Sequence, residues 1–112
     1  MPSSGLYGSY PLTAKKNDEV VKGISAGVYT LGYKKEESFY TQYVGRSDSD
    51  LNDRLHDYVD SKYERFKYGF YNSIEDAFKK ECSLYHDFNP KDNSIHPDRP
   101  NGTNYICPVC ET

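Results

Sequence analysis

The feature that most constrains the fold is a pair of short segments in which a valine lies between a glycine and a tyrosine. Gly27-Val28-Tyr29 begins a run of strand-forming residues, and Tyr43-Val44-Gly45 ends a second run. The charged segment 34–38 between the runs is typical of a turn, so the pattern predicts an antiparallel hairpin. Across such a hairpin, the side chains of Tyr29 and Tyr43 can approach each other.

Two helices and one more strand are predicted after the hairpin. Leu51, Leu55 and Tyr58 recur at a helical spacing, and a second helical pattern covers residues 73–87. The aromatic segment 62–72 between them reads as a strand. We therefore expect an α+β domain whose small antiparallel sheet has three strands and is flanked by helices.

The ends of the chain differ in composition from this core. With 112 residues the chain can close one hydrophobic core, which we assign to residues 23–88. Residues 1–22 are rich in Ser, Gly, Lys and Asp and are expected to form a loosely ordered N-terminal arm. Residues 89–112 hold four of the six prolines, so this tail needs an anchor outside itself.

Charge and hydropathy limit the class of protein. A net charge of -3 argues against nonspecific binding of nucleic acid, but it is compatible with a small basic cleft. The chain has no apolar run near the roughly 20 residues that span a bilayer and no recognisable signal peptide. We expect a cytoplasmic protein without membrane contacts.

Several side chains suit phosphodiester hydrolysis, which needs a base, a positioned water and a cation near the phosphate. Arg54 and Tyr58 are four residues apart on the first predicted helix and share a face. Glu81, on the second helix, is a hard oxygen ligand suited to Mg²⁺ or Mn²⁺.

In this order, these segments resemble the GIY-YIG nuclease superfamily, small metal-dependent enzymes that cut phosphodiester bonds. The resemblance implies that Tyr29 is the general base and that Tyr43 orients the water and the phosphate. It also implies that Arg54 stabilises the charge of the transition state and that Glu81 binds the divalent ion. The similarity covers roughly residues 24–88.

The closest match in motif is the nuclease half of the bacterial excision-repair incision subunit. A basic residue follows the glycine there, and a tyrosine follows the helix arginine by four, as Arg46 and Tyr58 do here. A tyrosine base needs a lowered pKa, which we expect from Arg46, Arg54 and the metal ion. Many members also carry an asparagine after the glutamate, and four candidates remain open for it: Asn89, Asn93, Asn101 and Asn104.

Cysteine and histidine form a second candidate site. Cys82 and His86 share a face of the second predicted helix, and Cys107 and Cys110 form a knuckle-like pair in the tail. Together they can make a closed tetrahedral zinc site that anchors the tail. His96 is the alternative fourth ligand.

Three functions follow from these patterns. The leading interpretation is a hydrolase, a metal-dependent endonuclease that binds and cuts DNA. The alternatives are an inactive nucleic-acid-binding domain with the same fold and a zinc-stabilised module that binds another protein. An electropositive cleft around Arg46 and Arg54 favours the nuclease, whereas dispersal of the candidate residues over separate faces favours the protein-binding module.

Overall fold

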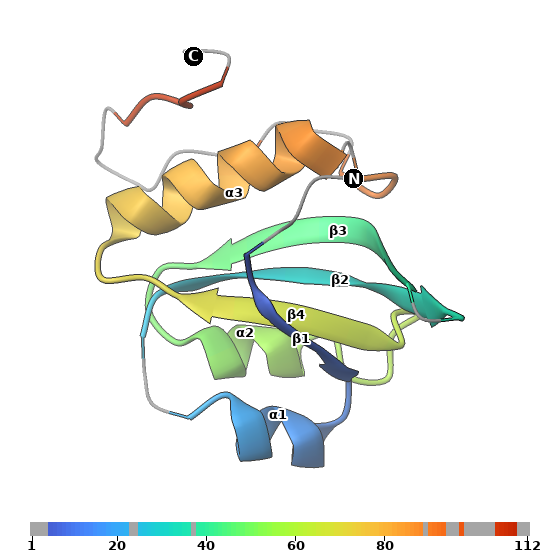
Figure 1. Cartoon of the computed structure of the whole chain (residues 1–112). Helices are drawn as coiled ribbons and strands as arrows, with labels where there is room; N and C mark the ends of the chain where they lie inside the picture. Colours follow the sequence, from blue (N-terminus) through green and yellow to red (C-terminus); the bar gives the residue numbers. More distant parts are fainter. Residues whose placement is uncertain are drawn as a thin grey trace.

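The structure, a computed structural model, describes residues 5–22, 25–36, 38–88, 90–93, 97 and 105–109. These residues form an antiparallel sheet with helices on both of its faces (Figure 1). The elements in chain order are β1 (Tyr7–Pro11), α1 (Ala14–Val20), β2 (Gly27–Lys35), β3 (Ser38–Ser47), α2 (Leu51–His56), β4 (Arg65–Phe70) and α3 (Ile74–Phe88).

The predicted hairpin is present as β2 and β3. The strands run antiparallel with Tyr29 opposite Gly45, and the register shifts by one residue between Leu31 and Gly32. In the sheet order β1-β4-β2-β3, β3 is an edge strand. One side of β3 is therefore open to other parts of the chain.

The sheet has four strands, so our expectation of three is wrong. The additional strand, β1, comes from the segment that we expected to form a loose arm, and α1 follows it directly. The rings of Tyr7 and Tyr10 lie 5.7 and 5.8 Å from those of Tyr68 and Phe66, so aromatic contacts fasten β1 to β4. The pairing of β1 is irregular near Gly8, and this irregularity hides the two-residue period in the sequence.

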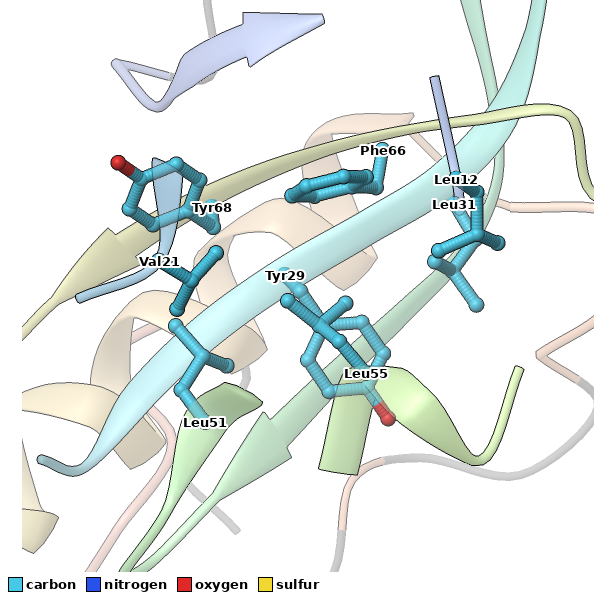
Figure 2. Packing of buried hydrophobic residues seen from close by; sticks show 8 residues of the cluster. All are labelled: Leu12, Val21, Tyr29, Leu31, Leu51, Leu55, Phe66 and Tyr68. Carbon is cyan, nitrogen blue, oxygen red and sulfur yellow. The ribbon is translucent and has the colours of Figure 1, made fainter. Parts of the chain in front are cut away.

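The two faces of the sheet have separate cores. On one face, α1 and α2 enclose a cluster of eight buried residues, shown in Figure 2: Leu12, Val21, Tyr29, Leu31, Leu51, Leu55, Phe66 and Tyr68. On the other face, α3 packs against β2 and β3 through Val28, Val44, Ala77 and Leu84. Alternation along β2 therefore sends Val28 and Tyr29 into different cores.

Side-chain caps begin both helices near the candidate site. The Asp50 carboxylate accepts a bond from the Asp53 N–H at the start of α2, and the Ser73 hydroxyl accepts one from the Asp76 N–H at the start of α3. Helix α2 is shorter than expected, because it ends at His56 and the chain continues as a turn. Tyr58 therefore lies in this turn and not on the helix.

Within the described residues, the longest helix is α3, and no helix has the length and apolarity needed to cross a bilayer.

Candidate active site

Tyr29 forms the centre of the candidate site. Its side chain is fully buried on the α2 side of the sheet, and its ring extends across β3 at Gly45. A Cβ atom at position 45 would lie 2.3 Å from both Cζ and the hydroxyl oxygen of Tyr29. Gly45 therefore provides the space that the Tyr29 ring occupies.

Three phenol rings gather at this place. The Tyr29 ring lies 6.3 Å from that of Tyr43 and 5.8 Å from that of Tyr58, measured between centroids, and the last two rings are 5.8 Å apart. The Tyr29 hydroxyl donates to the Tyr58 oxygen at 3.5 Å, which is a long hydrogen bond. The predicted approach of Tyr29 and Tyr43 is confirmed.

Arg54 on α2 borders this tyrosine cluster. Its guanidinium carbon lies 5.8 Å from the centre of the Tyr58 ring, and its Nη1 forms an exposed ion pair with Asp57 at 3.3 Å. The pKa of Arg54 is raised, and the largest cause is its interaction with Tyr29. Arg54 and Tyr58 therefore remain neighbours although Tyr58 has left the helix.

Glu81 and Arg46 lie together on the opposite, α3 side of the sheet. Arg46 Nη1 is 2.7 Å from a Glu81 carboxylate oxygen, and each side chain is only 11% exposed. Arg46 also bonds to Asp48 at 2.6 Å and stacks over the Phe78 ring at 5.5 Å. The positive charge of Arg46 is thus balanced by two carboxylates.

The candidate residues form two groups that flank the edge strand β3. Tyr29, Tyr43, Tyr58 and Arg54 lie on the α2 side, whereas Arg46 and Glu81 lie on the α3 side. Strand β3 lies between the two groups, and within the described residues no further strand lies beyond it, because β3 is at the edge of the sheet. The two groups also interact, since the charge of Glu81 contributes to raising the pKa of Tyr43.

Burial controls the acidity of the two central tyrosines. Removal from water is the first cause that raises the pKa of Tyr29 well above its ordinary value, followed by the hydrogen bond with Tyr58. The same causes raise the pKa of Tyr43 to about 12. Arg54 lowers both values, but burial outweighs it. Our expectation of a lowered tyrosine pKa is therefore wrong for the protein by itself, and both phenols are protonated at neutral pH.

The donor set at Glu81 fits one kind of metal ion. Among the residues that the structure describes, no group of three or more His, Cys, Asp or Glu side chains could hold an ion by itself. Mg²⁺ commonly binds through one or two carboxylates, several waters and the phosphates of its substrate. A single carboxylate at Glu81 suits such a shared ion, and Arg46 competes with it for the same oxygen atoms.

An asparagine lies at the open edge of β3. Asn93 donates from Nδ2 to the Val44 carbonyl at 3.0 Å, and its Oδ1 accepts from the Val44 N–H at 2.7 Å. It is the only one of the four candidate asparagines within the described residues, since positions 89, 101 and 104 lie outside them. Asn93 therefore pairs the backbone groups that an edge strand would otherwise leave exposed.

Sequence reasoning missed the residues that hold this asparagine in place. Asp92 accepts from the Tyr63 hydroxyl at 2.8 Å and pairs with Lys62 at 2.9 Å, and its N–H donates to the Gln42 carbonyl at 2.9 Å. The sequence carried only a weak signal for this loop, a proline followed by polar residues. Contacts between residues 29 to 50 positions apart cannot be predicted from local patterns.

The candidate zinc ligands are described in part. Cys82 and Cys107 are buried in one cluster with Phe78, and Tyr105 packs against it. Figure 1 shows the segment 105–109 on the side of α3 that faces away from the sheet. His86 follows Cys82 by four residues on α3, whereas His96 and Cys110 lie outside the described residues. The zinc site stays a prediction.

Comparison with known proteins gives no match to a family model, to a curated protein or to a solved structure. The function of this chain is therefore inferred from its residues and from the geometry of its site.

Proposed function

We propose that this chain is a metal-dependent endonuclease of the GIY-YIG type that hydrolyses phosphodiester bonds in DNA. The observation that supports it most is the gathering of three phenols and a guanidinium on one side of the edge strand β3, with the buried carboxylate of Glu81 on its other side. A phosphodiester at this edge would find a base, a cation and a metal ligand together.

In this proposal each residue has one role. Tyr29 would accept a proton from the attacking water as its phenolate, having lost its own proton to solvent when a bound divalent ion lowers its raised pKa. Tyr43 and Tyr58 orient the water and the phosphate. Arg54 stabilises the negative charge that develops on the phosphoryl oxygens, and it also lowers the pKa of Tyr29. Glu81 holds a Mg²⁺ or Mn²⁺ ion, which supplies Lewis acidity when it is bound. Arg46 keeps the carboxylate of Glu81 in position.

Asn93 has a supporting role in this site. Its two hydrogen bonds to Val44 fix the backbone between Tyr43 and Gly45, and Gly45 lies against the Tyr29 ring. Because those bonds end on main-chain atoms, we assign Asn93 to positioning of β3 and not to contact with the substrate.

An inactive nucleic-acid-binding domain is the second candidate. It is favoured by the pairing of Arg46 with Asp48 and Glu81 and of Arg54 with Asp57, which leaves little net positive charge at the site. A protein-binding module stabilised by zinc is a third candidate. It is favoured by the division of the candidate residues between the two faces of the sheet, and by the buried pair Cys82 and Cys107, which lies outside the tyrosine cluster.

A plasmid-nicking assay with added Mg²⁺ or Mn²⁺ tests the leading proposal. Glu81→Gln keeps the shape of the side chain and removes its charge, so cleavage should fall by at least about a hundredfold, the usual scale for losing a central charge in an active site. Glu75→Gln is the matched control, because Glu75 lies on the same helix in an exposed pair with Lys79. Equal cleavage by both variants, or no metal-dependent cleavage by the parent, would overturn the proposal.

A further inference from the structure

A basic pocket lies on the sheet near the turn of the β2–β3 hairpin. Its volume is about 330 Å³, and each of the four strands contributes to its lining: Gly8, Ser9, Lys34, Phe39, Arg65 and Lys67. Three of these six residues are cations, and none is a carboxylate.

The pocket lies on the same face of the sheet as Glu81. Arg65 and Lys67 alternate along β4 with Phe66, whose ring belongs to the core on the other face. The helix on the pocket's face, α3, packs on β2 and β3. The pocket occupies the part of this face toward β1 and the hairpin turn.

The three cations are available for a ligand. Among the described residues, Lys34, Arg65 and Lys67 form no ion pair with a carboxylate, whereas Arg46 and Arg54 of the candidate site both do. Because like charges repel, a bound anion would stabilise this arrangement.

Two of the cations are also held in place. Arg65 donates from Nε to the Ser9 hydroxyl at 2.9 Å and from Nη2 to the Ser9 carbonyl at 2.8 Å. The ammonium of Lys67 lies over the Phe39 ring, 5.2 Å from its centre. Fixed donors lose little conformational entropy when an anion binds, which favours binding.

We propose that this pocket binds a backbone phosphate of the DNA whose cleavage is proposed above, and the inference rests on that proposed function. Phe39 and Arg46 lie on the same strand and are separated by roughly 23 Å at a rise of about 3.3 Å per residue. That distance equals about seven base pairs at about 3.4 Å per pair. One duplex can therefore contact the pocket and the edge of β3 together, and the pocket supplies local positive charge to an acidic protein.

The salt dependence of DNA binding tests this inference. The full chain, without added divalent ion, is titrated onto a fluorescent duplex of about 20 base pairs, and the dissociation constant is measured by anisotropy between about 50 and 200 mM KCl. The variant Lys34→Ala/Lys67→Ala should bind more weakly at low salt. Its slope of log affinity against log salt should be smaller by about 0.9, because the pocket contacts one phosphate and each phosphate contact contributes about 0.9.

A control variant matches the change in net charge. Lys15→Ala/Lys79→Ala also removes two positive charges, from α1 and α3, and it should keep the slope of the parent. Lys34→Ala alone, at an exposed position, should show about half of the change in slope and guards against misfolding of the double variant. Equal slopes for the pocket and control variants, or no DNA binding by the parent, would overturn the inference.

Two further measurements separate the possible sources of the phosphate and the two proposals. One outcome is that the parent binds inorganic phosphate, the pocket variant does not, and the salt slope of DNA binding is the same in both. This result would identify a site for small phosphates and overturn the assignment to DNA. Plasmid cleavage by the pocket variant should show a raised KM and an unchanged kcat. Pocket-dependent DNA binding without cleavage would leave this inference standing and remove only the nuclease.

Discussion

The ion pair between Arg46 and Glu81 offers the sharpest test of the site geometry. Arg46→Met removes the guanidinium, together with its stacking on Phe78, but keeps an apolar side chain at this position. Exposed pairs contribute about 0–1 kcal/mol, whereas breaking a fully buried pair costs about 3–5 kcal/mol. With both side chains 11% exposed, we expect a loss of about 2–3 kcal/mol in the free energy of unfolding.

This loss should be measurable by heat and by urea. At about 2.1 cal/mol/K of unfolding entropy per residue, a chain of this length loses about 4 °C in Tm for each kcal/mol, so Arg46→Met should melt about 8–13 °C below the parent. Lys79→Met is the matched control, because Lys79 pairs with Glu75 on the same helix while both side chains are about half exposed. The control should lose no more than about 1 kcal/mol.

Manganese extends the same experiment to function. If Glu81 binds a divalent ion, Mn²⁺ at about ten times its dissociation constant stabilises the fold by about 1.4 kcal/mol. The shift should be larger in Arg46→Met, where the guanidinium no longer competes, and absent in Glu81→Gln. An Arg46→Met variant that is no less stable than Lys79→Met would refute the buried pair, and a manganese shift retained in Glu81→Gln would refute the assigned ligand.

Three further expectations concern other parts of the molecule. Gly45→Ala places a methyl group against the Tyr29 ring, so it should destabilise the fold by about 1–3 kcal/mol in urea titration and reduce cleavage; wild-type stability would contradict the ring position. Because the pKa of Tyr29 is raised, folded Tyr29 stays protonated at a pH where the same tyrosine ionises in the unfolded chain. The stabilisation from burying the neutral phenol is therefore complete below about pH 10 and is lost progressively above it. Between pH 9 and 11 the parent should lose about 1.4 kcal/mol more than Tyr29→Phe, and parallel losses would speak against the burial. Protein purified without added zinc should carry one Zn²⁺ per chain, and Cys107→Ser should carry less; a parent without zinc, or full occupancy in the variant, would exclude this site.

Local sequence patterns determined the hairpin, the helix starts and the identity of the candidate catalytic residues. Strand-forming residues around a charged turn specify β2 and β3, and side-chain oxygens at Asp50 and Ser73 cap the helices. These signals work because they depend on neighbours a few residues apart. The resemblance to a nuclease family depends on the same short segments. For that reason it indicates which side chains are candidates but not what surrounds them in the fold.

Only the tertiary structure decided what surrounds those side chains. The pairing of β1 with β4, the ion pair of Arg46 with Glu81 and the bonds of Asn93 to Val44 all join segments far apart in the chain. Burial likewise reversed the expected direction of the tyrosine pKa, because the number of protein atoms around a phenol follows from packing and not from spacing. The basic pocket has the same origin, since its lining comes from four strands that meet only in the folded sheet.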